Sequence, residues 1–400
     1  MPNSPILSHE ELALLEKEVN FHHTLRWATQ IKHYPETAYK FWMRALDALE
    51  KVWFDNHLYE GLPNISKKCT RVQIGEVELK TPIILAAGMF KKPENVPRNA
   101  HKWNVGAVTI GGITGDPQNG NPGKRLWIYP DIQAAVNCFG LNGPGRIVAA
   151  ENLRARKERW DMPRCPIILN SCNGLASQTM EDKIAEHVAN FETFFDLVEI
   201  FEVNISCPNQ KGAQAMSGDI NLLVGTLRAL QKKNDELAAK TRRPKKPIIL
   251  KIKPDYFDEE GGVDEKALAR IVEATQWLVG GYTTTNTTTD RSSLNQAGHE
   301  NPGKGWLSGA PLLQKQLIIT RIVRELLDKD GATDKIIIST GGIGTGKSIT
   351  EIMETGEQAI LSGADLVGVY TGLMLNGRAV PSLISAGMEK KRKERKNNDF

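Results

Sequence analysis

Eight short apolar runs, separated by longer stretches with helical spacing, constrain the fold of this 400-residue chain more than any other feature. Most of the runs are apolar almost throughout, as in parallel strands that are buried on both faces. They cover residues 83–87, 107–110, 167–170, 198–204, 248–252, 281–286 (the polar exception), 336–340 and 366–370. Helical stretches between them include residues 183–194, 264–278, 313–327 and 348–361. This alternation predicts a parallel α/β fold, and eight units predict a closed (β/α)8 TIM barrel.

The sequence before the first run has a different pattern, which predicts an N-terminal helical extension. Residues 35–54 place apolar side chains, several of them large aromatics, at the i, i+3, i+4, i+7 spacing of one helical face. A weaker stripe precedes it, at Leu12, Leu14, Leu15 and Val19. Two interpretations are open: these helices pack onto the barrel, or they form an amphipathic module that contacts a membrane or a lipophilic ligand.

These patterns divide the chain into three parts. We expect an extension over residues 1–68, the barrel domain over residues 69–387 and a basic tail over residues 388–400. Within the barrel domain, the interval 114–166 is too long for one crossover. It predicts an insertion that lies across the barrel mouth, where loops carry function.

Charge and cysteine content exclude several classes of function. The formal net charge is only +4, and much of it lies in the tail at residues 390–396, which is typical of a solvated helix end. Contact of this tail with an anionic membrane is the alternative, and no basic patch indicates a nucleic-acid partner. The five cysteines form no CxxC pair, so we expect no metal site, no iron–sulfur cluster and no disulfide framework. A reducing compartment, the cytoplasm, fits this pattern, and neither a signal peptide nor a membrane-spanning run is apparent.

Polar residues follow the predicted strands at the points where they end. In a barrel these ends share one rim, where function collects. Four asparagines are expected to converge there, and their amides suit a planar ligand with carbonyl and N–H edges: Asn137, Asn204, Asn209 and Asn286. Lys251 lies near the end of the fifth run, where an unpaired ammonium is costly. It either extends to solvent or faces an electron-accepting cofactor.

A glycine-rich loop, Gly341–Gly346, follows the seventh run. Backbone N–H groups in such a loop can approach an anion closely, and barrels frequently bind phosphate after strands seven and eight. With Tyr370 and Thr371, this loop predicts a phosphate site.

Cys207 lies between Ser206 and Pro208, just past the fourth run. A free cysteine is most often a small buried hydrophobe. In a polar loop, however, a thiol can act as a base if neighbouring donors lower its ordinary pKa of about 8.5. Both interpretations are open.

Taken together, these stretches resemble the dihydroorotate dehydrogenase family over roughly residues 70–385. The resemblance rests on short motifs that occur in a fixed order. They are Ala86-Ala87-Gly88 with Lys91, residues 118–122 with Arg125-Leu126, residues 137–142, residues 204–209, residues 251–255, residues 285–288, residues 307–312, Gly341-Gly342 and Tyr370-Thr371.

The resemblance implies an FMN-dependent oxidation of dihydroorotate to orotate in pyrimidine (UMP) biosynthesis. It gives Cys207 the role of the base that takes the C5 proton while hydride passes from C6 to FMN. It implies these substrate contacts: Lys91, Asn137, Phe139, Gly140, Leu141, Asn204, Asn209, Asn286 and Thr287. It implies these FMN contacts: Ala86, Ala87, Gly88, Gly111, Asn137, Asn170, Asn204, Lys251, Thr285, Ser308, Gly309, Thr340, Gly341, Gly342, Val369, Tyr370 and Thr371.

Two branches of the family are mixed in this sequence. The extension, the His33-Tyr34-Pro35 helix start and Leu307-Ser308-Gly309 resemble the membrane-associated, quinone-reducing branch. Cys207 stands where that branch has serine and the soluble branch has cysteine. We favour quinone as the acceptor, with residues 1–65 in peripheral contact with the inner face of the cytoplasmic membrane. The alternatives are a soluble fumarate- or NAD-linked enzyme, a related dihydropyrimidine oxidoreductase, and a non-catalytic flavin-binding protein. The sequence leaves the oligomeric state open.

Overall fold

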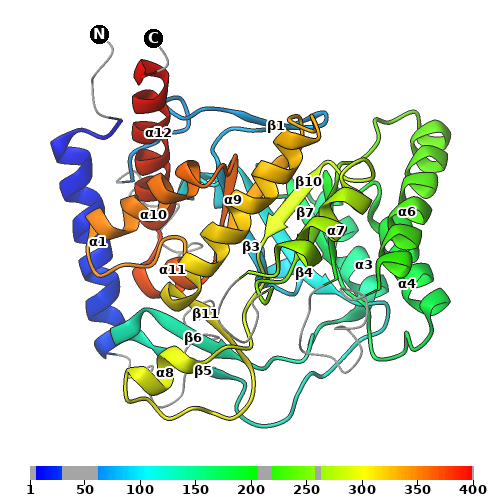
Figure 1. Ribbon diagram of the computed structural model, residues 1–400, viewed down its shortest axis with the longest axis horizontal. Helices are drawn as coiled ribbons and strands as arrows, with labels where there is room; N and C mark the ends of the chain where they lie inside the picture. The colour runs from blue at the N-terminus through cyan, green and yellow to red at the C-terminus, as the bar shows by residue number, and fades with distance from the viewer. Residues whose placement is uncertain (1–5, 29–61, 206–218, 257–262, 399–400) are drawn as a thin grey trace.

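A closed barrel of eight parallel strands forms the centre of the computed structural model, which describes residues 6–28, 62–205, 219–256 and 263–398 (Figure 1). The strands are β3 (Ile83–Phe90), β4 (Ala107–Ile113), β7 (Ile167–Ser171), β8 (Ile200–Asn204), β9 (Ile248–Ile252), β10 (Gly281–Thr284), β12 (Ile336–Thr340) and β13 (Leu366–Val369). β13 pairs with β3 and closes the barrel. All eight predicted strands are confirmed, with ends that differ by at most three residues, and so is the barrel itself.

Helices cover the outside of the barrel. They are α3 (Gly145–Glu158), α4 (Met180–Phe194), α6 (Ile220–Thr241), α7 (Glu265–Thr275), α9 (Leu313–Lys329), α10 (Ile349–Leu361) and α12 (Val380–Asn398). A capping box starts α4, where Thr179 and Asp182 exchange hydrogen bonds. The first crossover departs from the ideal pattern, because only the 3₁₀ turns Pro93–Asn95 and Ala100–Trp103 connect β3 to β4.

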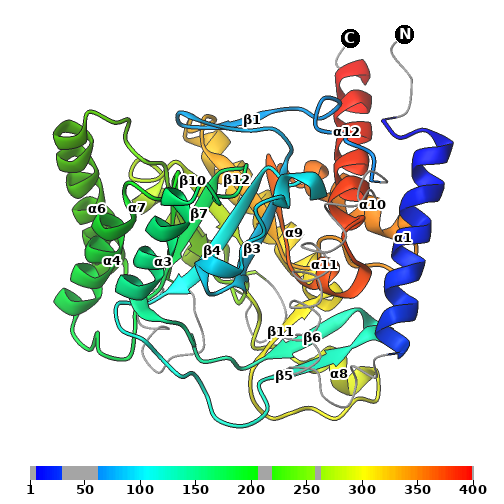
Figure 2. The same ribbon diagram turned by 180° about the vertical axis from the view of Figure 1, so that it is seen from behind.

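A small antiparallel sheet covers the carboxyl ends of the barrel strands (Figures 1 and 2). Its strands are β5 (Leu126–Tyr129), β6 (Ala134–Asn137) and β11 (Trp306–Gly309). β5 and β6 come from the interval 114–166, so the predicted insertion across the mouth is confirmed. The third strand comes from the segment between β10 and β12, which the sequence did not indicate. At the opposite end, the hairpin of β1 (Val72–Ile74) and β2 (Val77–Leu79) packs on the amino ends of the barrel strands.

Helix α1 (His9–Ala28) packs onto the barrel domain beside α11 (Thr371–Asn376). Leu15 and Val19 are buried in this contact, whereas Leu14, which the predicted stripe included, is exposed. The first of the two interpretations therefore holds for α1. The predicted helix at residues 35–54 lies outside the described residues. Within the described ranges, no helix is both long enough and apolar enough to cross a bilayer.

Polar contacts fix the middle and the C-terminal part of α1. Glu18 forms an ion pair with Arg378 at 3.1 Å. The His23 Nε2 lies 2.8 Å from the Asn376 Oδ1 at the end of α11. The Asn376 Nδ2 in turn donates to the Gly344 carbonyl and to the Gln133 Oε1, at 3.0 Å each. This network joins the extension to the glycine-rich loop after β12.

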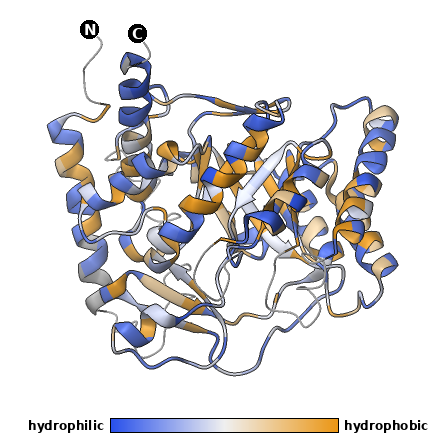
Figure 3. Cartoon of the chain, viewed as in Figure 1, coloured by the Kyte–Doolittle hydropathy of each residue, from blue (hydrophilic) through white to orange (hydrophobic). Residues whose placement is uncertain are grey.

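Helix α12 continues through the predicted start of the tail at residue 388. Met388 and Glu389 are buried, and Glu389 accepts hydrogen bonds from Thr70. From Lys390 onward the described side chains are at least partly exposed, and Figure 3 shows this end of the helix as hydrophilic. In Figures 1 and 3 it projects from the end of the molecule opposite the β5–β6–β11 sheet.

Candidate active site

A cavity lies between the barrel mouth and the β5–β6–β11 sheet. Its free volume is about 1100 Å³ when its open mouth is included, which is enough for a cofactor and a small substrate. Most residues that the sequence predicted line its wall: Ala86, Ala87, Gly88, Lys91, Asn137, Phe139, Leu141, Asn170, Asn204, Lys251, Thr285, Asn286, Thr287, Ser308, Gly309, Thr340, Gly341, Gly342, Tyr370 and Thr371.

Three predicted residues that the structure describes, Gly111, Gly140 and Val369, are not on this wall. Cys207 and Asn209 lie outside the described residues. Gly111 and Val369 alternate with Gly112 and Gly368, which do line the cavity, because neighbouring strand residues face opposite sides. Gly140 backs onto Asn121 rather than facing the cavity.

The structure adds wall residues to which the sequence analysis assigned no individual contact: Gly112, Leu126, Ala135, Asn142, Leu312, Ile343 and Gly368. Several come from the small sheet and its surroundings, whose position no local pattern reveals. The sequence analysis also missed Glu202, which does not line the cavity but is hydrogen-bonded to the wall residue Asn170. It is the one charged residue in the apolar run of β8. A buried charge in such a run is the signal that could have found it.

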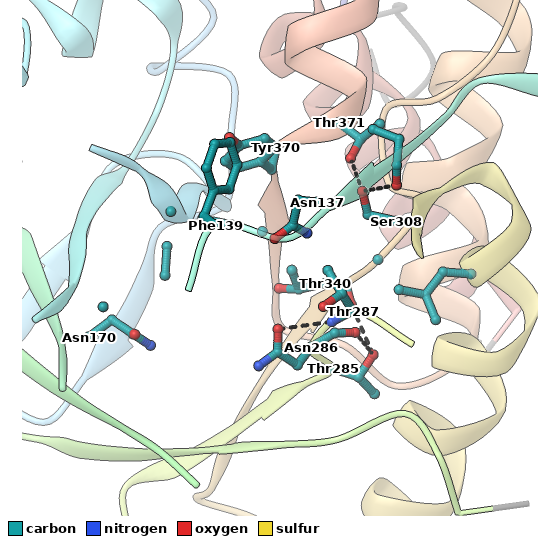
Figure 4. A pocket seen from close by; sticks show the side chains of 18 of the residues that line it. Asn137, Phe139, Asn170, Thr285, Asn286, Thr287, Ser308, Thr340, Tyr370 and Thr371 are labelled. Carbon is teal, nitrogen blue, oxygen red and sulfur yellow. Dashed lines mark hydrogen bonds between the residues drawn. The ribbon is translucent and has the colours of Figure 1, made fainter. Parts of the chain in front are cut away.

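One end of the cavity is lined by backbone and hydroxyl groups. Gly309 and Gly342 have φ values of 100° and 74°, which favour glycine. A Cβ on Gly309 would lie 2.2 Å from the Gln133 carbonyl, and one on Gly342 would lie 2.7 Å from the Leu313 Cβ. Ser308 and Thr371 face each other here, with their hydroxyl oxygens 2.9 Å apart (Figure 4). Such a surface suits a phosphate group.

Lys251 places a cation at the wall of the cavity. It lies on β9 and is 5% exposed. It forms no hydrogen bond or ion pair with any residue that the structure describes. Because a buried ammonium without a partner is costly, this part of the wall suits an electron-rich or anionic group of a ligand.

Three asparagines form a row across the barrel mouth. The Asn286 Nδ2 donates to the Asn204 Oδ1, and the Asn204 Nδ2 donates to the Asn170 Oδ1, each at 3.3 Å. In Figure 4, Asn170 lies on one side of the cavity, Asn286 near its centre, and Ser308 with Thr371 on the far side. Of the four asparagines that the sequence places at the rim, Asn137, Asn204 and Asn286 line the wall of this cavity.

Lys91 lies at the outer part of the cavity. Its Nζ donates to the Asn142 Oδ1 at 2.6 Å and lies 3.7 Å from the centre of the Phe139 ring. These contacts hold the ammonium in a fixed position at the cavity wall. A ligand carboxylate is a suitable additional partner for an ammonium in this position.

Two other thiols in the described part of the chain are unsuited to act as bases. Burial, followed by the nearby Glu389, raises the pKa of Cys69 to about 12. Burial, followed by Glu199, raises the pKa of Cys165 to about 12. The Cys172 side chain is fully buried. Both titrating thiols are therefore protonated at neutral pH.

A cavity with a phosphate-binding end, a buried cation and a row of amides suits a planar, electron-accepting cofactor that carries a phosphate. This combination at the mouth of a (β/α)8 barrel defines a flavin-dependent oxidoreductase. The chain belongs to the dihydroorotate dehydrogenase family, whose model matches residues 69–391. FMN is the cofactor of this family.

Curated relatives support the assignment. A dihydroorotate dehydrogenase (quinone) from Brucella anthropi is 33% identical over 328 residues, which is 82% of each chain. One from Brucella ovis is 32% identical over 317 residues, 79% of each chain. Among solved structures, the dihydroorotate dehydrogenase of Eimeria tenella in complex with ferulenol has a TM-score of 0.66 at 25% identity, and covers 80% of this chain and 83% of that chain.

The residues present fit FMN. Gly309, Gly342, Ser308 and Thr371 would hold its phosphate, and Lys251 would face its ring system. The unpartnered ammonium of Lys251 and the two glycines that no larger residue could replace are the observations on which this fit rests.

Replacing Lys251 tests this fit. We expect Lys251→Met to weaken FMN binding at least tenfold, about 1.4 kcal/mol, because the cation facing the ring is lost. The melting temperature of the apoprotein should stay the same or rise, since an uncompensated buried charge is removed. Titration of apoprotein with FMN, followed by flavin fluorescence, measures the first effect. Lys245→Met, at an exposed ion pair with Asp235, is the matched control. Unchanged FMN affinity in Lys251→Met would contradict the assignment.

Proposed function

We propose that this protein oxidises dihydroorotate to orotate and passes the electrons to a quinone. The observation that carries the substrate assignment is Lys91, a fixed ammonium in the outer part of the cavity. Dihydroorotate has a carboxylate, which Lys91 can bind as a charge-assisted partner. A dihydropyrimidine without a carboxylate would have no use for this residue.

The asparagines orient the substrate ring. Asn137, Asn204 and Asn286 present amide groups to the cavity, and these match the alternating carbonyl and N–H edges of a dihydropyrimidine. Asn209 and Thr287 are proposed to complete these contacts. Holding the ring in one position reduces the entropy cost of reaching the transition state.

Cys207 is the proposed base. β8 ends at Asn204, so the residues that follow it start from the rim of the cavity. In the proposed reaction the Cys207 thiolate takes the proton from C5 and the C6–H bond breaks, leaving a C5=C6 double bond. Bound FMN supplies the acceptor for the hydride from C6.

The choice of quinone rests on two observations. The curated relatives carry the name dihydroorotate dehydrogenase (quinone). The N-terminal extension is also built into this fold, because α1 packs beside α11 and is hydrogen-bonded to Asn376. We further propose that residues 1–65 make peripheral contact with the cytoplasmic membrane, where a lipophilic acceptor is found.

A soluble, fumarate- or NAD-linked enzyme is the second candidate. The observation that favours it is the cysteine at position 207, which resembles the soluble branch.

Anaerobic addition of dihydroorotate to the yellow holoprotein should bleach the flavin absorbance.

We expect Lys91→Ala to lower kcat/KM for dihydroorotate by about 10- to 100-fold, because a charge-assisted hydrogen bond is lost. Lys92→Ala, the exposed neighbour, serves as the matched control. A protein that stays yellow would exclude this substrate, and unchanged turnover in Lys91→Ala would exclude the role of Lys91.

Cys207→Ala should retain FMN but lose turnover. In the unsubstituted protein, kcat/KM should rise about tenfold per pH unit below the pKa of the thiol in the free enzyme and level off above it, because only the thiolate accepts the proton. Steady-state rates between pH 5.5 and 9.5 measure this profile. Full activity of Cys207→Ala would remove this residue from the mechanism.

The acceptor is identified by reoxidation of the reduced enzyme. We expect a short-chain ubiquinone to restore the yellow flavin absorbance at least tenfold faster than equal concentrations of fumarate or NAD. Stopped-flow absorbance under anaerobic conditions measures these rates. Faster reoxidation by fumarate or NAD would favour the second candidate.

A further inference from the structure

Glu202 is a buried carboxylate in the wall of the barrel. It lies in the middle of β8, where its neighbours Phe201 and Val203 are apolar, and it is 5% exposed. No cation forms an ion pair with it in the described part of the chain. Its Oε1 accepts a hydrogen bond from the Thr283 hydroxyl at 2.5 Å, and its Oε2 accepts one from the Asn170 Nδ2. Burying a carboxylate costs free energy of desolvation, so a carboxylate at this position is expected to have a function.

The carboxylate is one end of a chain of hydrogen bonds that all run in the same direction. The Thr287 backbone N–H donates to the Asn286 Oδ1 at 2.9 Å. Asn286 donates to Asn204 and Asn204 donates to Asn170, each at 3.3 Å. Asn170 then donates to Glu202. The chain crosses the barrel mouth from the residues after β10 to β7 and β8.

The two ends of the chain favour one orientation for every amide between them. An asparagine side chain can rotate by 180° and exchange its carbonyl for its NH₂ group, so its orientation depends on its partners. A backbone N–H can only donate, and an ionised carboxylate can only accept. Within this chain of hydrogen bonds, the fixed donor at Thr287 and the fixed acceptor at Glu202 favour the same orientation of Asn286, Asn204 and Asn170.

We propose that Glu202 is a positioning residue that fixes which edge of Asn170 and Asn204 faces the ligands. It does not touch the ligands itself, because it is absent from the cavity wall, whereas Asn170, Asn204 and Asn286 line it. The expected effect of Glu202 on FMN affinity depends only on FMN being the cofactor of the family. The expected effect on orotate affinity rests on the proposed function. An amide that turns over would present a donor where the ligand requires an acceptor, and a mismatched polar pair in a buried site is costly.

The test compares two substitutions at this position. Glu202→Met keeps an unbranched side chain and removes the acceptor, so we expect FMN and orotate to bind about tenfold more weakly, a loss of about 1.4 kcal/mol. Glu202→Gln keeps a carbonyl that can accept from Asn170, so we expect affinities within about threefold of the parent. FMN is titrated into apoprotein, and orotate is titrated into holoprotein and followed by its perturbation of the flavin spectrum.

A double-mutant cycle separates positioning from a general structural role. If Glu202 acts through the amides, Glu202→Met should add less than about twofold to the loss caused by Asn204→Ala. The control pair is Glu202→Met with Thr371→Ala, at the opposite end of the cavity, where the two losses should multiply. Circular dichroism and melting temperature verify that the variants fold. If Glu202→Met does not fold, Glu202→Ala, which leaves room for water, replaces it in the same cycle.

Three results would overturn the inference. The first is an unchanged ligand affinity in Glu202→Met, and the second is that the losses of Glu202→Met and Asn204→Ala multiply. The third is a loss in Glu202→Gln as large as that in Glu202→Met, which would show that the charge of Glu202 matters and the direction of its hydrogen bonds does not. Failure of the parent holoprotein to bind orotate would instead reject the proposed substrate. Even without orotate binding, the double-mutant cycle measured by FMN affinity would test the role of Glu202.

Discussion

The pairing of β13 with β3 is the contact on which the rest of this structure depends. It closes eight strands that all run in the same direction, so every carboxyl end meets at one rim. Residues that are far apart in the sequence, such as Lys91, Lys251 and Thr371, are therefore brought to one cavity. The strands are buried on both faces, and hydrophobic burial holds this rim rigid while the loops that extend from it remain free to carry polar groups. The ends of the strands therefore set the positions of the polar residues in the site, and the loops that follow them make a smaller contribution.

Much of this arrangement could be predicted from the sequence, because two of its causes are local. Apolar runs of strand length predict the eight strands. The polar residues at or directly after their ends predict the members of the site, as for Asn204 at the end of β8. Gly111 and Val369, which the resemblance implies as FMN contacts, do not line the cavity, whereas their strand neighbours Gly112 and Gly368 do. A shift of one residue along a strand changes the face, and no pattern within a short apolar run reports it.

The remainder depends on contacts between distant segments. β11 joins β6 across more than 160 residues, and the amide row depends on three different barrel strands or their ends. The direction of that row could not be read from residue types, because an asparagine offers a donor and an acceptor at the same position. Glu202 was visible as a charge in an apolar strand, but its partner Asn170 belongs to the preceding strand of the barrel. Only the folded barrel shows that they meet.

The positions of the two chain ends have a consequence for contact with a lipid surface. α1 runs along the side of the molecule, and its C-terminal end lies near the β5–β6–β11 sheet, while the basic end of α12 projects from the opposite end (Figures 1 and 2). A flat bilayer that touches one end of a globular particle cannot touch the other. Attachment through the chain that follows α1 would thus turn the positive end of α12 toward bulk water. With such an attachment, hydrophobic insertion and electrostatic adhesion, the two signals that usually act together in reversible membrane binding, would be uncoupled by the shape of the protein.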